Sequence, residues 1–173
     1  MKKLIFAAFA AVLFLGCTAP PVITEPIFTL KDINGQELKK GQTVTVTDFD
    51  AAAAPDKLLF DGNIDSEEAF NLEVTVTREN VADASDELCV SNCIPSNHQA
   101  TQNFGFAVGD GQTRFYAHFG ERETEIEYDD EGNVTSEIEH HLSNGDYRII
   151  YDFHEKEYPT ASIKITVIYK YNK

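Results

Sequence analysis

FNLEVTVT at residues 70–77 and SIKITVIYKY at residues 162–171 are the two stretches of sequence that decide the fold. In both, apolar and polar side chains alternate with a period of two, and β-branched and aromatic residues fill most apolar positions. Successive side chains of an extended chain point to opposite faces, so each stretch presents one apolar row to a core and one polar row to solvent. Both stretches therefore predict half-buried antiparallel β-strands.

The same alternation recurs through the rest of the chain. No helix is predicted, because the helix-friendly run at residues 51–54 is followed at once by Pro55. Turn-forming pairs such as Asn34-Gly35 and Asn144-Gly145 separate the alternating rows. Uneven strand lengths favour two packed sheets over a barrel, so we predict an all-β sandwich of seven to ten antiparallel strands. The further rows are Phe104, Phe106 and Val108; Phe115, Ala117 and Phe119; Ile126 and Tyr128; Val134, Ser136 and Ile138; and Tyr147, Ile149, Tyr151 and Phe153.

Residues 27–173 contain no step in charge and no long linker, so they are predicted to form a single β-sandwich domain. Within them, residues 26–50 are expected to add an N-terminal hairpin laid against the sandwich. The chain carries 29 acidic and 14 basic residues, a formal net charge of −15. Neutralising phosphates requires clustered Lys and Arg, so this composition excludes a nucleic-acid-binding protein.

The N-terminus has the order of a secretory signal. A basic start at residues 1–3 is followed by an apolar run over residues 4–15, which is too short to span a bilayer. The next residues, Gly16 and Cys17, complete a segment that resembles the lipobox of bacterial lipoproteins. That resemblance implies a signal peptide at residues 1–16 and lipidation of Cys17. The alternative is an ordinary signal peptide cleaved nearby, with Cys17 an incidental thiol.

Residues 17–26 contain three prolines and no apolar periodicity, so they are expected to form a semi-rigid tether after the lipidated cysteine. Thr18 stands directly after Cys17 where an Asp would be a retention signal. By resemblance to lipoprotein sorting, this implies the outer membrane. No acidic cluster follows the cysteine, which favours the periplasmic face; the cell surface is the alternative.

The two remaining cysteines, Cys89 and Cys93, are separated by three residues. In an oxidising compartment such a pair is expected to form a small-loop disulfide. Two alternatives stay open. A redox pair of the thioredoxin type would need two intervening residues at a helix N-terminus, and a zinc site would need two more ligands, with His98 the only nearby histidine.

Nine acids and one arginine lie between Glu121 and Glu139, in a segment whose alternation predicts a hairpin with its turn at residues 129–133. One interpretation is a solvated face whose charge prevents edge-to-edge pairing. A second is an acidic patch for a basic partner. A third is a calcium site with oxygen ligands at alternate positions, although the pattern departs from the EF-hand because Ile138 stands where the bidentate Glu should be. The candidate calcium ligands are Glu127, Asp129 and Glu131.

The five histidines are scattered among acids and are interpreted as surface residues, with His118 half exposed beside Tyr116. Neighbouring strand residues point to opposite faces, so His140 and His141 cannot share one ion without a bulge. The sequence contains no G-x-S-x-G, no H-E-x-x-H and no phosphate-binding glycine loop. No enzyme activity, catalytic residue or cofactor other than calcium is therefore expected.

Six segments together resemble the small immunoglobulin-like β-sandwich lipoproteins of Gram-negative bacteria, most of which have no assigned function. This resemblance implies an immunoglobulin-like fold and a place in the cell envelope. The segments are LLFDGNID (58–65), LEVTVTREN (72–80), LCVSNCIP (88–95), FYAHF (115–119), GDYRIIYDF (145–153) and SIKITVIY (162–169).

These observations lead to one functional hypothesis and two alternatives. The hypothesis is a non-catalytic protein-interaction module, held to the membrane by its lipid anchor and binding an envelope protein. The first alternative is an inhibitor of a basic hydrolase such as lysozyme. The second is a calcium-dependent ligand-binding domain.

Overall fold

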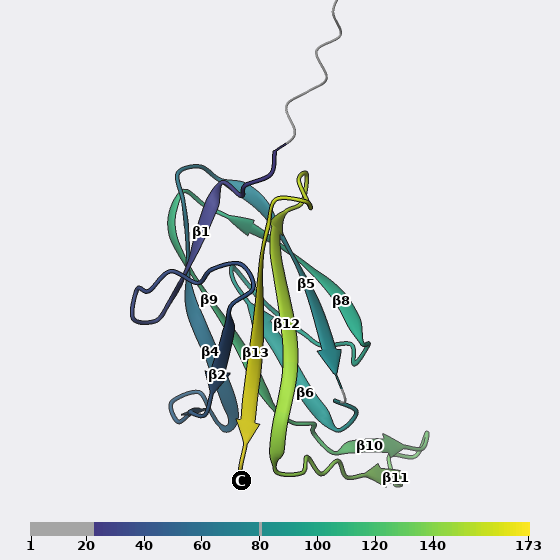
Figure 1. The fold of residues 1–173 in the computed structure, drawn as a ribbon. Helices are drawn as coiled ribbons and strands as arrows, with labels where there is room; N and C mark the ends of the chain where they lie inside the picture. The colour runs from purple at the N-terminus through teal and green to yellow at the C-terminus, as the bar shows by residue number, and fades with distance from the viewer. Residues whose placement is uncertain (1–22, 80) are drawn as a thin grey trace, which may run out of the picture.

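The computed structural model describes residues 23–79 and 81–173, which contain thirteen β-strands and no α-helix (Figure 1). The all-β prediction is confirmed. The strand count exceeds the expected seven to ten because four strands of two to five residues, at residues 28–32, 43–46, 49–50 and 93–95, are too short for an alternating row to stand out. The strands are β1 (Phe28–Asp32), β2 (Thr43–Val46), β3 (Phe49–Asp50), β4 (Ala54–Ser66), β5 (Phe70–Glu79), β6 (Ala84–Cys89), β7 (Cys93–Pro95), β8 (Thr101–Val108), β9 (Gly111–Glu121), β10 (Glu125–Tyr128), β11 (Val134–Ile138), β12 (Gly145–Glu155) and β13 (Ser162–Tyr171).

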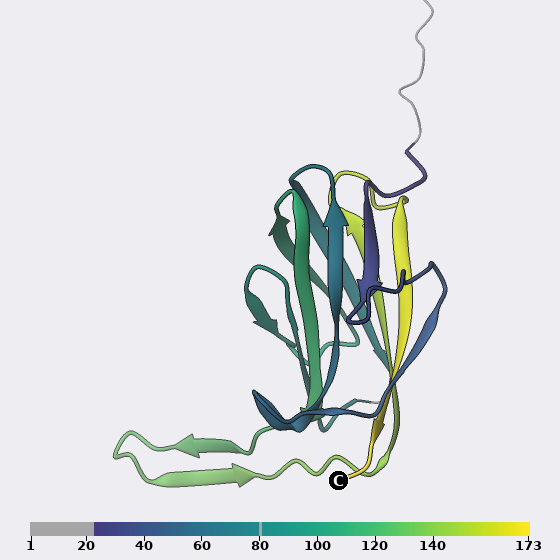
Figure 2. The ribbon, with the colours of Figure 1, turned by 90° about the vertical axis from the view of Figure 1, so that its left-hand side faces the viewer.

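Eleven of these strands form two sheets that pack face to face (Figures 1 and 2). Sheet A has the order β1-β4-β9-β6-β7, with β3 also paired to β4, and sheet B has the order β2-β13-β12-β5-β8. Every pair within the sheets is antiparallel except β2 and β13, which are parallel. The remaining strands, β10 and β11, pair only with each other.

The apolar rows of the two deciding stretches lie in the core between the sheets, as predicted. In β5, Leu72, Val74 and Val76 are buried, and in β13 the buried row runs from Ile163 to Tyr171. The two sheets meet through aromatic rings: Phe119 of sheet A stacks on Tyr169 of sheet B with ring centroids 4.8 Å apart. Burial of these side chains is the main favourable term that holds the sheets together.

The prediction of an N-terminal hairpin at residues 26–50 is wrong. β1 pairs with β4 in sheet A, whereas β2 pairs with β13 in sheet B, so this segment crosses from one sheet to the other. The turn at Asn34-Gly35 closes only a single bridge, between Lys31 and Glu37. Crossing between the sheets lets the segment bury apolar side chains in both halves of the core, which a hairpin laid outside could not do.

One ion pair joins the two sheets inside the core. Arg78 of β5 donates to both carboxylate oxygens of Asp86 of β6, with Nε–Oδ1 at 2.7 Å and Nη2–Oδ2 at 2.8 Å. The guanidinium also donates to the Gln99 carbonyl at 3.2 Å and lies over the ring of Phe104. Burying a charge is tolerated only when it is paired and hydrogen-bonded, and this pair meets both conditions.

A disulfide links Cys89 at the end of β6 to Cys93 at the start of β7, the pair that the sequence predicted. Cys17 and the expected signal peptide, residues 1–16, lie outside the described residues, as does the tether up to residue 22. Among residues 23–79 and 81–173, no helix is long and apolar enough to cross a membrane.

Candidate interaction surface

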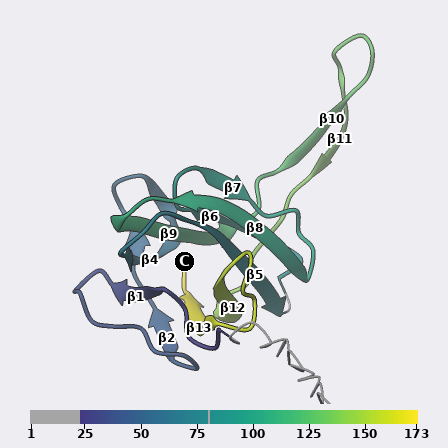
Figure 3. The same cartoon turned by 90° about the horizontal axis from the view of Figure 1, so that it is seen from above.

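The hairpin of β10 and β11, residues 125–138, projects from the sandwich and is called the arm below (Figures 2 and 3). It leaves the body between β9 and β12, at the end opposite to the segment that leads into β1 (Figures 1 and 2). Ile23 lies beside the loop between β12 and β13, where Thr160 Oγ1 donates to its carbonyl at 3.5 Å. β12 has eleven residues; at a rise of about 3.3 Å per residue, the two ends of the body are about 35 Å apart.

The arm carries most of the large apolar side chains that the described residues leave exposed. These side chains are Ile126 (43%), Tyr128 (61%), Val134 (56%) and Ile138 (46%), four of seven. The sequence predicted half-buried rows here, and that expectation is wrong. The alternating residues do form two paired strands. In the described residues, however, these strands pair with neither sheet, and their apolar side chains stay exposed.

The pairing register gathers three of these side chains on one face of the arm. Directly opposed residues share a face, and Tyr128 opposes Val134 while Ile126 opposes Glu137. The register shifts between Glu127 and Tyr128, and this irregularity brings Val134 opposite Tyr128. Ile138 opposes Glu125 and lies on the other face, together with Glu127 and Ser136. A two-stranded hairpin with one uncovered apolar face is marginally stable alone in water, so a surface that covers Ile126, Tyr128 and Val134 would stabilise it.

Acidic residues are concentrated in the arm and at its base. Nine acids and a single arginine lie between Glu121 and Glu139, and the arginine, Arg122, is already paired with Glu125 at the base of the arm. Carboxylates around an apolar centre complement a basic surface with apolar side chains at its middle. The arm therefore has the two features, apolar centre and charged rim, expected of a protein-binding surface.

The three candidate calcium ligands lie at the tip of the arm, but the structure gives Asp129 another role. Its Oδ1 accepts from the backbone N–H groups of Glu131 at 2.9 Å and Asn133 at 2.8 Å, and its Oδ2 accepts from Asn133 Nδ2 at 3.0 Å. These bonds, the Asn133 side chain first, lower the pKa of Asp129. Asp129 thus holds the turn closed.

Glu127, Asp129 and Glu131 do not come together as a cluster of ligand atoms. Among the described residues, one group of three has its ligand atoms within 4.8 Å of each other, and it consists of Glu87, Cys89 and Cys93. The sulfurs of that group are joined in the disulfide, so they are not free to ligate a metal. Calcium binding by the arm remains a prediction from the sequence.

The interpretation of the histidines as surface residues is wrong for His118, which is only 5% exposed. Its Nε2 lies 2.9 Å from Asp50 of β3 and its Nδ1 lies 2.7 Å from Glu87 of β6. The hydrogen bond from His118 is the first cause of the lowered pKa of Asp50. His118 therefore joins β3 and β6 across the outer face of sheet A. The sequence does not reveal this, because Asp50 and Glu87 are far from His118 along the chain.

His154 is also buried, with Nε2 3.3 Å from Glu73 and Nδ1 3.2 Å from the Asp152 carbonyl. Glu73 belongs to β5, which pairs with the strand of His154. Both buried histidines are thus occupied by neighbours in their own sheets. This arrangement is typical of residues that hold strands together.

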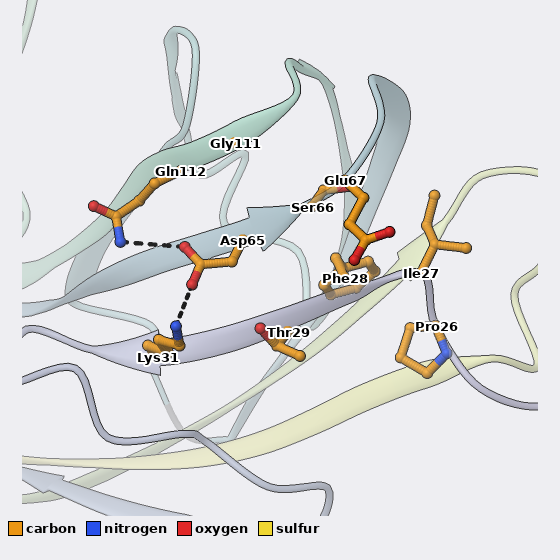
Figure 4. A pocket seen from close by; sticks show the side chains of 10 residues that line it. All are labelled: Pro26, Ile27, Phe28, Thr29, Lys31, Asp65, Ser66, Glu67, Gly111 and Gln112. Atoms are coloured by element: carbon orange, nitrogen blue, oxygen red, sulfur yellow. Dashed lines mark hydrogen bonds and ion pairs between the residues drawn. The ribbon is translucent and has the colours of Figure 1, made fainter.

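A hollow of about 680 Å³ lies beside β1 at the end of the body near Ile23 (Figure 4). Its polar wall is formed by Lys31, Asp65 and Gln112, which bond one another: Lys31 pairs with Asp65, and Gln112 Nε2 donates to Asp65 at 3.2 Å. Pro26 and Ile27 line the other side (Figure 4). These three polar groups bond one another, so they are not free to bind a ligand; Thr29, Ser66 and Glu67 also line the hollow.

No family model and no curated protein matches the chain. Among solved structures, the N-terminal domain of PorA aligns with a TM-score of 0.56 and 14% identity, over 84% of this chain and 97% of that domain. At this identity the likeness shows the fold alone, an immunoglobulin-like β-sandwich.

Two further structures align more weakly, and neither supports an argument. The CooA pilin subunit from enterotoxigenic Escherichia coli has a TM-score of 0.40 and 12% identity, over 86% of this chain and 100% of the subunit. The PapD-like domain of human CEP192 has a TM-score of 0.39 and 8% identity, over 96% of this chain and 98% of that domain.

Proposed function

We propose that this protein is a non-catalytic, lipid-anchored envelope protein that binds a partner protein through the arm. The observation that carries the proposal is the apolar face of Ile126, Tyr128 and Val134, which is exposed on an arm rich in acidic residues. Exposed apolar groups that gather on one projecting element, rather than being scattered singly, mark interaction sites. The partner is a protein with a basic rim around an apolar patch.

The position of the arm supports a role at a distance from a membrane. A lipid on Cys17 would fasten the chain at the Ile23 end, and the arm leaves from the other end of the body (Figure 2). The outer membrane, with the body facing the periplasm, is the proposed location. The net charge of −15 adds to this arrangement, because anionic headgroups repel an acidic body.

Site-specific photo-cross-linking in the native envelope tests the proposal. A benzophenone amino acid replaces Tyr128 on the arm in one strain and Tyr158, 41% exposed in the loop between β12 and β13, in a matched strain. We expect a discrete cross-linked partner from position 128 and none of the same mass from position 158. Substituting both Ile126 and Val134 by serine should remove that cross-link.

Identical cross-links from both positions, or none from position 128, would contradict the proposal. The serine substitutions lie on an exposed face outside the core, so the free energy of unfolding of the sandwich should change by less than about 0.5 kcal/mol. A melting curve of the purified double variant provides this control.

Inhibition of a basic hydrolase is a second candidate, which the nine acids around the apolar face favour. With hen lysozyme, we expect inhibition that weakens steeply as the salt concentration rises from low to physiological. At an ionic strength of about 0.15 M, the attraction between surface charges more than about 8 Å apart is largely screened. Inhibition independent of salt, or absent at low salt, would eliminate this candidate.

A further inference from the structure

The last strand of sheet B, β8, has an open edge with an unusual composition for this protein. A quarter of all residues are charged, yet the eight residues TQNFGFAV of β8 include no charged residue and no proline. Among the strands of the described residues, β8 pairs with β5 on one side and with none on the other. Proteins normally protect an open edge with charge, proline or short length, because unpaired N–H and C=O groups attract another strand.

The other strands at the ends of the two sheets are protected in these ways. β1 carries Lys31 and Asp32, and its backbone is covered by bonds from Leu38 N–H to the Leu30 carbonyl and from Asp32 N–H to the Gln36 carbonyl. β2 has four residues, and β7 has three and ends in Pro95. β8 is therefore the exception among the strands that end the two sheets.

One hydrogen bond fixes which backbone groups of β8 point outward. Arg78 N–H donates to the Ala100 carbonyl, so the bonds to β5 recur at every second residue from Ala100 onward, at Gln102, Phe104, Phe106 and Val108. The residues between them direct N–H and C=O away from β5, and all four are exposed: Thr101, Asn103, Gly105 and Ala107. In the described chain these outward backbone groups make no hydrogen bond.

We propose that the β8 edge binds an extended, uncharged segment of a partner protein, which adds to sheet B as a sixth strand. The outward backbone groups supply the hydrogen bonds for such β-strand addition. Charge favours a neutral segment: β8 offers no carboxylate to a basic strand, while the acidic body repels an acidic one. On the exposed face of β8, a Cβ at Gly105 would meet nothing within 4 Å, so the side chains that an incoming strand directs to this face meet open space there.

A second copy of this chain fits the edge less well. Two β8 strands paired antiparallel about a twofold axis would run in opposite directions, so the Ile23 ends of the two copies would lie at opposite ends of the pair. This step rests on the proposed function: two chains that are lipidated at Cys17 and stand upright on one membrane cannot adopt that arrangement. The occupant is therefore a different protein.

Amide hydrogen exchange, measured by NMR on the purified chain without its lipid, tests the proposal. In the free protein, the amides of Asn103, Gly105 and Ala107 should exchange fast, while those of Phe104 and Phe106 are protected by β5. The probe is a synthetic eight-residue peptide of alternating threonine and valine with blocked ends. It should slow exchange at the three outward amides by about tenfold or more. The same peptide with alternate amides N-methylated should have no effect.

Two variants show whether the edge itself carries the binding. Ala107→Pro and Gly105→Pro each remove one outward N–H without removing a bond to β5, so each should abolish the peptide effect while the melting curve still shows a folded sandwich. Asn71→Lys is the matched control: it places a substitution on the neighbouring exposed position of β5, opposite Ala107, and should retain the effect.

Three results would overturn the proposal: unchanged exchange with the peptide, equal protection by the N-methylated peptide, or outward amides already protected in a free protein that sediments as a dimer. The last result would assign the edge to a second copy. None of these measurements involves the arm, so their outcome is independent of the cross-linking experiment at position 128.

Discussion

At the residue scale, buried polar side chains are stabilised by hydrogen-bond partners on other strands. Arg78 and Asp86 lie in different sheets, and each is buried because the other is within hydrogen-bond distance. Counting every second residue from Leu72 predicts that the side chain of residue 78 faces the core. The sequence has an arginine at this position, where an apolar residue is expected. The tertiary structure explains the exception by supplying a carboxylate and an aromatic face.

Asp86→Ala should destabilise the protein by about 3–5 kcal/mol, because it leaves the Arg78 charge buried without a partner. The double variant Arg78→Met, Asp86→Leu should recover most of that loss, since it removes both charges and refills the space with apolar atoms. Urea unfolding followed by circular dichroism measures both changes. A double variant as unstable as the single one would show that the packing around the pair, and not the stranded charge, sets the cost.

At the element scale, the arm depends on one turn. Asp129 accepts hydrogen bonds from the backbone of Glu131 and Asn133, and Gly132 adopts the positive φ of 85° that this turn requires. Because β10 and β11 pair with no other strand, loss of the turn cannot be compensated by a neighbouring sheet. The arm is thus the element most sensitive to a single local substitution.

Asp129→Ala should loosen the arm without unfolding the sandwich. Amide exchange in β10 and β11 should become faster, while the melting temperature of the body changes by no more than a few degrees. Asp130→Ala is the matched control, since Asp130 is exposed at the next position and no contact of its side chain holds the turn. Equal loosening by both variants would show that charge, rather than the hydrogen bonds of Asp129, organises the turn.

Calcium can be tested on the same element. With the oxygens of Asp129 occupied by the turn, millimolar calcium should leave the melting temperature of the wild-type protein unchanged. A rise that disappears in Glu131→Gln would instead support the calcium hypothesis.

At the scale of the whole molecule, residues 23–26, which lead into β1, and the arm lie at opposite ends of the sandwich (Figure 1). If Cys17 carries the proposed lipid, this arrangement should direct the arm away from the membrane. Labels on two matched cysteine variants test it in vesicles that contain the lipidated protein: Asp130→Cys on the arm and Glu157→Cys in the loop between β12 and β13. A short-range quencher carried by the lipids should dim the label at position 157 and leave the label at position 130 unchanged. Equal quenching would show that the body lies flat on the bilayer.

The sequence by itself determined the fold class, the inward rows of β5 and β13, and the pairing of Cys89 with Cys93. These follow from periodicity and close spacing, which act within a few residues and are visible along the chain. It also predicted the acidic hairpin and the lipid anchor, of which the second lies outside the described residues.

Only the tertiary structure decided which of the alternating apolar rows are buried and which are exposed. Alternation looks the same in a strand that packs on a core and in one that projects beyond it, so the exposure of Ile126, Tyr128 and Val134 could not be read from their spacing. The same holds for the open edge of β8 and the burial of His118, which depend on strands distant in sequence. Burial and strand pairing are properties of neighbours in space, and the order of strands in a sheet is set by the packing of the whole chain.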